Sequence, residues 1–267
     1  MDVLEDMDYY CVDNMPAQLV PTFLELIEKS GHKKVAMAAD VRSINSPHEF
    51  ASVAASLQAT GVTYKIIFLE CADAELVKRY QLSRRRHPLM HQSENNIADA
   101  IERERALLAP LRERADYIID TTFSKPQQLK QRLLDLLNEE HTEGMKIYCM
   151  SFGFKYGSPS EADLMFDVRC LPNPYYVEEL KEKTGQDAAV QDYVMHSNNS
   201  KLLLEKFTDL TEYLIPLYEA EGKSQLVIAF GCSGGHHRSV TFAEKLAQNL
   251  KAKGLSPIIT HRDIEKG

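Results

Sequence analysis

The stretch that decides the fold reads Ser-Gln-Leu-Val-Ile-Ala-Phe over residues 224–230, Gly-Cys-Ser-Gly-Gly-His-His-Arg-Ser over 231–239, and Val-Thr-Phe-Ala-Glu-Lys-Leu-Ala-Gln-Asn-Leu-Lys-Ala-Lys over 240–253. The first segment is β-prone and largely apolar, which is typical of a strand buried on both faces of a parallel sheet. The last segment has apolar residues at helical spacing. A glycine-rich turn therefore joins a parallel strand to a helix.

This turn carries the groups that a phosphate site needs. Backbone N–H groups at a helix N-terminus point outward, and the helix dipole also favours an anion there. Arginine can fork onto two phosphate oxygens, and histidine and serine can donate further hydrogen bonds. We therefore predict a phosphate or metabolite site formed by Cys232, Ser233, Gly234, Gly235, His236, His237, Arg238 and Ser239, with Ser239 capping the helix.

Two other interpretations of the turn remain open. The segment also fits Cys-x5-Arg-Ser, the loop in which cysteine-dependent phosphatases attack phosphorus with a thiolate. Gly231 stands where such enzymes usually have a histidine, so binding is favoured over catalysis by Cys232. The remaining alternative is a purely structural turn with Cys232 as a small buried residue. The paired histidines and the arginine favour anion binding over that alternative.

Outward from this turn, strand-like and helix-like segments alternate along the whole chain. We predict strands over 9–12, 35–41, 64–71, 117–120, 146–152, 166–170, 224–230 and 257–261, and helices over 19–29, 47–59, 74–80, 97–114, 127–140, 202–220 and 240–253. Such alternation predicts an α/β fold with a mostly parallel, doubly wound sheet. A polar segment over 139–144 interrupts the pattern, so we expect two domains, 1–143 and 144–267.

Composition excludes several classes of protein. The net charge of −8 argues against a surface that is basic throughout. Five scattered cysteines form no metal-ligand spacing, so neither a metal site nor a disulfide framework is expected. No apolar run approaches the length of a membrane span, and the acidic N-terminal residues do not resemble a signal peptide. We expect a cytoplasmic protein that does not associate with membranes.

Several blocks of the sequence resemble the RapZ/YvcJ family. They are Tyr9–Pro16, Asp40–Ser43, Arg84–Leu89, Ser151–Gly157, Phe166–Arg169 with Leu171–Pro174, and Gly231–Val240. The resemblance implies a P-loop kinase-like parallel sheet in the first domain and a second α/β domain containing the strand, phosphate loop and helix. It also implies binding of ATP or GTP with Mg²⁺ and weak hydrolysis. The nucleotide-binding candidates are Asp40, Val41, Arg42, Ser43, Arg84 and Arg85.

The same resemblance implies a regulatory role for the second domain. Some family members act as RNase adapters, which bind a small regulatory RNA, present it to an endoribonuclease, and sense the phosphorylated amino sugar glucosamine-6-phosphate. Family members also form homo-oligomers. The basic residues that could neutralise RNA phosphates are Lys251, Lys253, His261, Arg262 and Lys266.

One family feature does not occur in residues 1–267. The family opens with a strand and a Gly-x-Ser-Gly-x-Gly-Lys-Ser loop that binds phosphates and places a hydroxyl on Mg²⁺. Without this loop we expect little or no nucleotide hydrolysis. Without its middle strand, the sheet should show a gap of about 9–10 Å, two strand spacings. A start codon placed too far downstream or a true truncation would explain the difference, and the well-kept remaining blocks favour the first.

Overall fold

The computed structural model describes residues 1–43, 49, 53, 57, 61–83, 86–90, 96–137 and 144–266. The chain forms two compact units, Met1–Leu137 and Asn138–Gly267. The helix predicted over 47–59 lies mostly outside the described residues. Among the helices that are described, none is long and apolar enough to cross a membrane.

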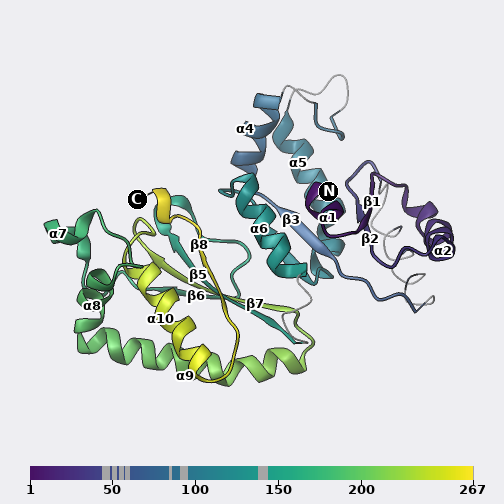
Figure 1. Cartoon of the computed structure of the whole chain (residues 1–267). Coiled ribbons are helices and arrows are strands. Elements are labelled where there is room, and N and C mark those ends of the chain that lie inside the picture. Colours follow the sequence, from purple (N-terminus) through teal and green to yellow (C-terminus); the bar gives the residue numbers. More distant parts are fainter. Residues whose placement is uncertain are drawn as a thin grey trace. The chain divides into compact units, whose positions relative to one another are not determined.

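The first unit consists of short parallel strands and helices (Figure 1). Its elements are α1 (Asp2–Glu5), β1 (Tyr10–Asp13), η1 (Ala17–Leu19), α2 (Val20–Ser30), β2 (Val35–Ala38), β3 (Ile67–Glu70), α4 (Asp73–Ser83), α5 (Ile97–Glu113), β4 (Tyr117–Asp120) and α6 (Pro126–Leu137). The predicted strands over 35–41 and 64–71 are longer than the observed ones, because only Val35–Ala38 and Ile67–Glu70 pair with a neighbouring strand.

The strands of this unit form two separate parallel pairs. β1 pairs with β2 and β3 pairs with β4, but no hydrogen bonds join β2 to β3. Apolar side chains of both pairs are partly exposed, with Met37 at 38% and Leu69 at 51%. The described strands of this unit therefore form two small parallel sheets rather than one.

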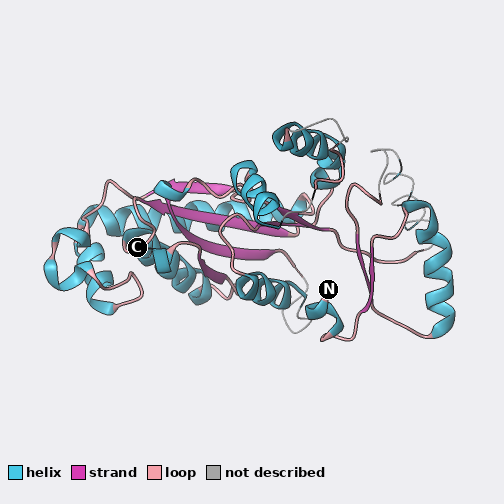
Figure 2. Cartoon of the chain, turned by 90° about the horizontal axis from the view of Figure 1, so that it is seen from above, coloured by secondary structure: helices cyan, strands magenta, loops and turns pink. Residues whose placement is uncertain are grey.

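The second unit is a single four-stranded sheet with helices (Figure 2). Its elements are β5 (Lys146–Gly153), η2 (Phe154–Tyr156), β6 (Leu164–Asp167), η3 (Pro174–Tyr176), α7 (Glu178–Lys181), α8 (Ala188–His196), α9 (Asn198–Ala220), β7 (Gln225–Cys232), α10 (Arg238–Ala252), β8 (Ile258–His261) and η4 (Ile264–Lys266). The strand predicted over 166–170 ends at Asp167. α7 and α8 were not predicted from the sequence.

All four strands are parallel, in the order β6-β7-β5-β8. The central strands β5 and β7 are almost fully buried. α9 and α10 pack against one face, where Phe207 of α9 stacks on Phe166 and also lies beside Phe230. Aromatic contacts of this kind add to the stabilisation that comes from burying apolar area.

The connections place a ligand-binding position at the ends of β5 and β7. The chain leaving β5 crosses β7 to reach β6, whereas the chain leaving β7 passes through α10 to β8 on the other side of β5. In open parallel sheets, the point where connections diverge leaves a crevice at the carboxyl ends of the strands, and ligands bind there. Gly153 and Cys232, the last residues of the two strands, are register partners at this point.

Candidate functional site: an anion cradle at the switch point

The loop after β7 packs closely against the loop after β5. Gly235 has φ +79°, a conformation that glycine adopts without strain. A Cβ atom on Gly153 would lie 2.6 Å from the carbonyl carbon of Gly234, so any side chain at Gly153 would push the two loops apart. These two glycines fix the path of residues 232–237, which we call the cradle.

The cradle presents backbone donors. Within the part of the chain that the structure describes, the N–H groups of Gly234, Gly235 and His236 donate to no protein acceptor. The first N–H bond inside α10 is from Thr241 to the His237 carbonyl, so the earlier N–H groups of the helix are also open. Unpaired N–H groups together with the dipole of a 15-residue helix favour an anion at this position.

Lys155 lies beside these donors, and the charged side chains of Asp167 and Arg169 occur at the carboxyl end of the neighbouring strand β6. A Cβ on Gly234 would be 3.9 Å from the Lys155 ammonium nitrogen. The Arg169 guanidinium stacks over the Phe154 ring at 4.3 Å and pairs with Asp167 at 2.6 Å. Hydrogen bonds from Arg169 hold the pKa of the Asp167 carboxyl below its usual value. Lys155 was not among the residues predicted from the sequence. The signal that could have identified it is the Gly-Phe-Lys-Tyr-Gly segment, in which glycines lie on both sides of a lysine at the end of a strand.

The Arg238 guanidinium is not fully available to bind a phosphate through two parallel hydrogen bonds. Its side chain is 5% exposed, and its Nη1 donates to the carbonyl oxygens of Arg169 and Leu171 at 2.6 and 3.2 Å. Its Nε is buried and, among the described residues, has no hydrogen-bond partner. The guanidinium thus ties the loop after β6 to the start of α10, and only part of its donor capacity remains for a ligand.

The two histidines of the cradle, His236 and His237, also make hydrogen bonds to backbone carbonyl oxygens. His236 donates from Nδ1 to the Ile264 carbonyl at 2.7 Å, because a carbonyl oxygen can only accept. His237 is buried, and its Nε2 lies 3.1 Å from the Lys181 carbonyl. Burial, and then the neighbouring His236, lower the pKa of His237. His237 therefore serves mainly to anchor the segment after α7.

Cys232 and Ser239 contact each other beneath the cradle. The thiol is 3% exposed and its sulfur lies 3.2 Å from the Ser239 hydroxyl oxygen. Ser239 is the second residue of α10, and His237 occupies the N-cap without a side-chain cap, so the expected capping by Ser239 was wrong. A buried thiol is poorly placed for attack on a bound phosphate.

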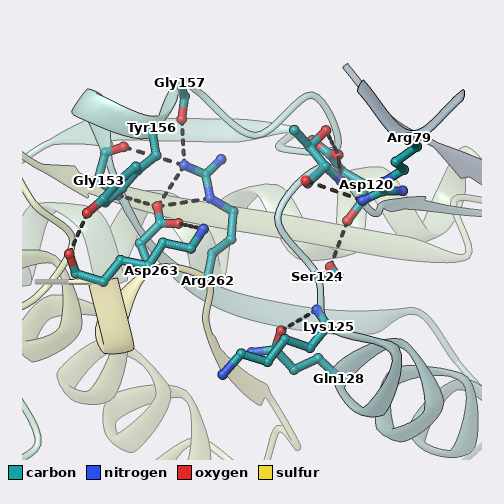
Figure 3. A network of polar contacts seen from close by, with 12 residues as sticks. Arg79, Asp120, Ser124, Lys125, Gln128, Gly153, Tyr156, Gly157, Arg262 and Asp263 are labelled. Carbon is teal, nitrogen blue, oxygen red and sulfur yellow. Dashed lines mark hydrogen bonds and ion pairs between the residues drawn. The ribbon is translucent and has the colours of Figure 1, made fainter. Parts of the chain in front are cut away.

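A buried carboxylate secures the other side of the cradle (Figure 3). Asp263 is fully buried and accepts hydrogen bonds from the Gly153 N–H at 2.8 Å, from the Arg262 guanidinium at 2.7 Å and from Lys266 at 2.9 Å. Arg262 also donates to the Gly157 carbonyl at 2.6 Å, and Tyr156 donates to the Lys266 carbonyl. Arg262 and Lys266, both RNA-binding candidates, thus hold the cradle together.

The other three RNA-binding candidates lie at two places. His261 is largely buried between the Ser151 hydroxyl at 2.8 Å and the Glu244 carboxylate at 3.2 Å. Lys251 and Lys253 are exposed at the opposite end of α10 from the cradle, and Lys253 pairs with Glu212 at 3.3 Å. The structure therefore does not gather the five predicted residues into one basic surface.

In the first unit, the segment after β2 is held by its own contacts. Arg42 binds both carboxylate oxygens of Asp40, and the Ser43 hydroxyl donates to Asn14 at 2.9 Å. These contacts join the carboxyl ends of β1 and β2. Val41 is buried beside them. Arg84 and Arg85 lie outside the described residues.

The carboxyl ends of β3 and β4 are joined by an arginine network. Arg79 donates to the Thr121 carbonyl at 2.6 Å and closes the turn after Asp120 (Figure 3). Arg112 binds the buried Glu70 carboxylate at 2.7 Å. Among the described residues, no group of three or more histidine, cysteine or acidic side chains is arranged to hold a metal ion.

Comparison with known proteins identifies relatives over nearly the whole chain. Residues 1–141 match the RapZ-like N-terminal domain and residues 145–265 match the RapZ C-terminal domain. A nucleotide-binding protein of Caldicellulosiruptor saccharolyticus is 46% identical over 98% of this chain and 90% of its own length. A nucleotide-binding protein of Lactiplantibacillus plantarum is also 46% identical, covering 98% and 89%. One from Bacillus cytotoxicus is 44% identical, with the same coverage as the second.

Proposed function

The chain belongs to the RapZ family, and from that premise we propose that it is a nucleotide-binding regulatory protein whose second unit senses a phosphorylated amino sugar. As an RNase adapter it would bind a small regulatory RNA, present it to an endoribonuclease, and self-associate. The observation that carries the sensing role is the cradle at the switch point, where open backbone N–H groups lie beside Lys155.

The charges around the cradle suit a ligand that carries both signs. A sugar phosphate offers an anion for the N–H groups, Lys155 and the helix dipole. An amino group on the sugar offers a cation, which would share the half-exposed Asp167 carboxylate with Arg169. A sugar phosphate without an amino group would leave Asp167 paired with Arg169 alone. We therefore expect glucosamine-6-phosphate to bind more tightly than glucose-6-phosphate.

Calorimetric titration of the full chain with these two compounds, glucosamine and inorganic phosphate tests the proposal. Replacing Lys155 with Ala should weaken sugar-phosphate binding about tenfold, since a charge-assisted hydrogen bond of about 1.5 kcal/mol is lost. Lys245→Ala, on the middle of α10, is the matched control and should bind as the parent does. Equal affinity in the parent and in Lys155→Ala, or no binding of either sugar phosphate, would refute the assignment.

A cysteine-dependent phosphatase is the alternative for the same loop, and the buried Cys232 thiol disfavours it. Replacing Cys232 with Ser separates the two functions. A binding protein keeps its ligand with unchanged affinity, whereas a phosphatase loses its turnover of an aryl phosphate. Turnover that disappears with Cys232→Ser would make the enzyme the correct interpretation.

For the first unit we propose binding of ATP or GTP with Mg²⁺ at the segment Asp40–Ser43, together with Arg84 and Arg85. The support is the position of this segment at the carboxyl end of β2, where doubly wound sheets bind ligands, and the nucleotide-binding relatives. Titration with each nucleotide, with and without Mg²⁺, tests it. Arg42→Ala should weaken binding, and identical heats for the parent and the variant would count against the assignment.

For RNA, we propose Lys251 and Lys253 as the residues that contact phosphates. Arg262, Lys266 and His261 make hydrogen bonds within the second unit instead. Phosphate contacts make binding fall with salt. In gel-shift titrations at two salt concentrations, Lys251→Glu with Lys253→Glu should lower affinity and flatten the salt dependence. Retention that is insensitive to salt in the parent protein would contradict RNA binding.

A further inference from the structure

Residues 262–266 follow the last strand of the second unit and lie against the cradle. β8 ends at His261, and the chain then forms a short turn that contains η4. The Arg262 N–H still donates to the Ser151 carbonyl at 3.0 Å, next to the end of β5. The residues after it reach the cradle itself. We call residues 262–266 the strap.

The strap contacts residues that carry the open N–H groups of the cradle. The buried Asp263 carboxylate accepts the Gly153 N–H at 2.8 Å (Figure 3). His236 donates from Nδ1 to the Ile264 carbonyl at 2.7 Å. A Cβ on Gly235 would lie 2.9 Å from the Asp263 Cβ, so strap and cradle are in direct contact there. The strap therefore forms one wall of the cradle.

The strap is also joined to the lysine assigned to the anion. Lys155 and Lys266 both place an ammonium group over the Tyr156 ring, at 4.8 and 5.0 Å from its centroid. The Tyr156 hydroxyl donates to the Lys266 carbonyl. The ring attracts each cation, but the two like charges repel each other. An anion that pairs with Lys155 offsets this repulsion and so favours the docked position of the strap.

The strap carries its own counter-charges, so it can leave the cradle as a unit. Asp263 pairs with Arg262 at 2.7 Å and with Lys266 at 2.9 Å, and all three residues belong to the strap. Release therefore breaks hydrogen bonds to the cradle without leaving Asp263 as an unpaired buried charge, which is the costly outcome. Short segments outside a sheet also open at a lower free energy than the core strands do.

Release of the strap changes the cradle. The Gly153 N–H loses its acceptor, and Gly235 and His236 lose a neighbour that fixes their positions. A ligand that binds only the docked form multiplies the ratio of docked to released chains by 1 + [L]/Kd. By the same linkage, release of the strap weakens ligand binding.

We propose that docking of the strap and anion binding in the cradle are coupled: the cradle binds an anion when the strap is docked, and the bound anion keeps the strap docked. The proposal rests on the sensing role proposed above and adds the regulation of that site. It gives the second unit two states that differ in a short segment at its surface. Ordering and release of such a segment is one of the ways in which proteins report a bound ligand.

Hydrogen exchange of the full chain, followed by mass spectrometry, tests the coupling with glucosamine-6-phosphate as the probe. Calorimetric titration of the same sample supplies the dissociation constant. At a free concentration of about nine times this constant, amide exchange in residues 263–266 should slow about tenfold, and exchange in α9 should stay unchanged. Binding without slower exchange in the strap would overturn the proposal and leave the sensing role intact. A chain that binds no sugar phosphate would overturn both.

Two variants separate the strap from a general loss of structure. Tyr156→Phe keeps the ring beside Lys155 but removes the donor to the strap, so exchange of the strap without ligand should be roughly two- to tenfold faster. Tyr175→Phe, at an exposed tyrosine, is the matched control and should change neither exchange nor affinity. Removing residues 264–267 should weaken sugar-phosphate binding at least about tenfold, since the docked form is lost. Parent-like affinity in the shortened chain, or parent-like exchange of the strap in Tyr156→Phe, would contradict the proposal.

Discussion

Asp263 and Asp167 provide a direct test of how burial sets the value of an ion pair. Both carboxylates bind an arginine at nearly the same distance, 2.7 Å for Asp263 with Arg262 and 2.6 Å for Asp167 with Arg169. The Asp263 side chain is fully buried, whereas that of Asp167 is 45% exposed. We predict that Asp263→Ala destabilises the protein strongly and that Asp167→Ala hardly does.

The magnitude follows from what Asp263→Ala leaves behind. The Arg262 side chain is 10% exposed and loses its carboxylate partner, and the Gly153 N–H loses its acceptor. Breaking a buried pair by removing one partner costs about 3–5 kcal/mol, because a charge stays buried without compensation. For a unit of this size the loss corresponds to roughly 10–20 °C in Tm. Asp167→Ala leaves Arg169 in solvent, where such pairs contribute little.

Guanidinium chloride denaturation followed by far-UV circular dichroism measures both variants on the full chain. Two units can unfold in separate transitions, so each transition is fitted by itself. We expect the midpoint of one transition to move to a much lower denaturant concentration in Asp263→Ala and to stay unchanged in Asp167→Ala. If the two variants shift the transitions equally, burial does not determine the contribution of these pairs, and the anchoring role of Asp263 is wrong.

Three more outcomes follow from the same contacts. Gly235→Ala should abolish sugar-phosphate binding, because its Cβ would lie 2.7 Å from the Gly153 nitrogen; Gly254→Ala, with φ +85° and open space around it, should cost only the strain of about 1 kcal/mol and leave binding intact. Burial lowers the pKa of His261, so this residue binds its proton at higher pH in the unfolded chain than in the folded one. The free energy of unfolding should therefore be highest above the unfolded pKa of about 6.5 and fall below it. His261→Gln should make the denaturation midpoint change less between about pH 6.5 and 5. Thr208→Val, which removes the hydroxyl that accepts from Asn249 at 3.0 Å, should lower the thermal midpoint, whereas Thr184→Val at an exposed turn should change it less.

The order of strands and helices was predictable because buried parallel strands occur in a sequence as continuous apolar runs. The β7 segment is a run of apolar residues in a fully buried strand, and the glycine-rich turn and helix that follow occur as expected. α8 was missed because its two buried residues, Val190 and Val194, give too short a repeat to recognise without the core they pack against. The strand predicted to reach Cys170 stops at Asp167, because that carboxylate accepts the Arg169 N–H and turns the chain.

The place of the cradle in the fold was predictable from the sequence, but the hydrogen-bond partners of its cations were not. The sequence pattern shows that Arg238 and His237 follow a turn. It does not show that they bind carbonyl oxygens of residues 69 and 57 positions away in the sequence. Lys155 went unnoticed for the opposite reason, since its nearness to Gly234 depends on the pairing of β5 with β7.

There is a physical reason why the arginine and the histidines bind protein carbonyl oxygens while the lysine remains for an anion. Loops that pack as closely as those around Gly153 and Gly234 bring many carbonyl oxygens out of water, and each needs a donor. Buried arginine and histidine supply such donors for Arg169, Leu171, Lys181 and Ile264. The groups then left for an anion are the backbone N–H groups of the turn and the exposed lysine. Recognition that rests on the backbone should tolerate changes of side chain in the cradle better than changes of glycine, because only the glycines determine where the N–H groups point.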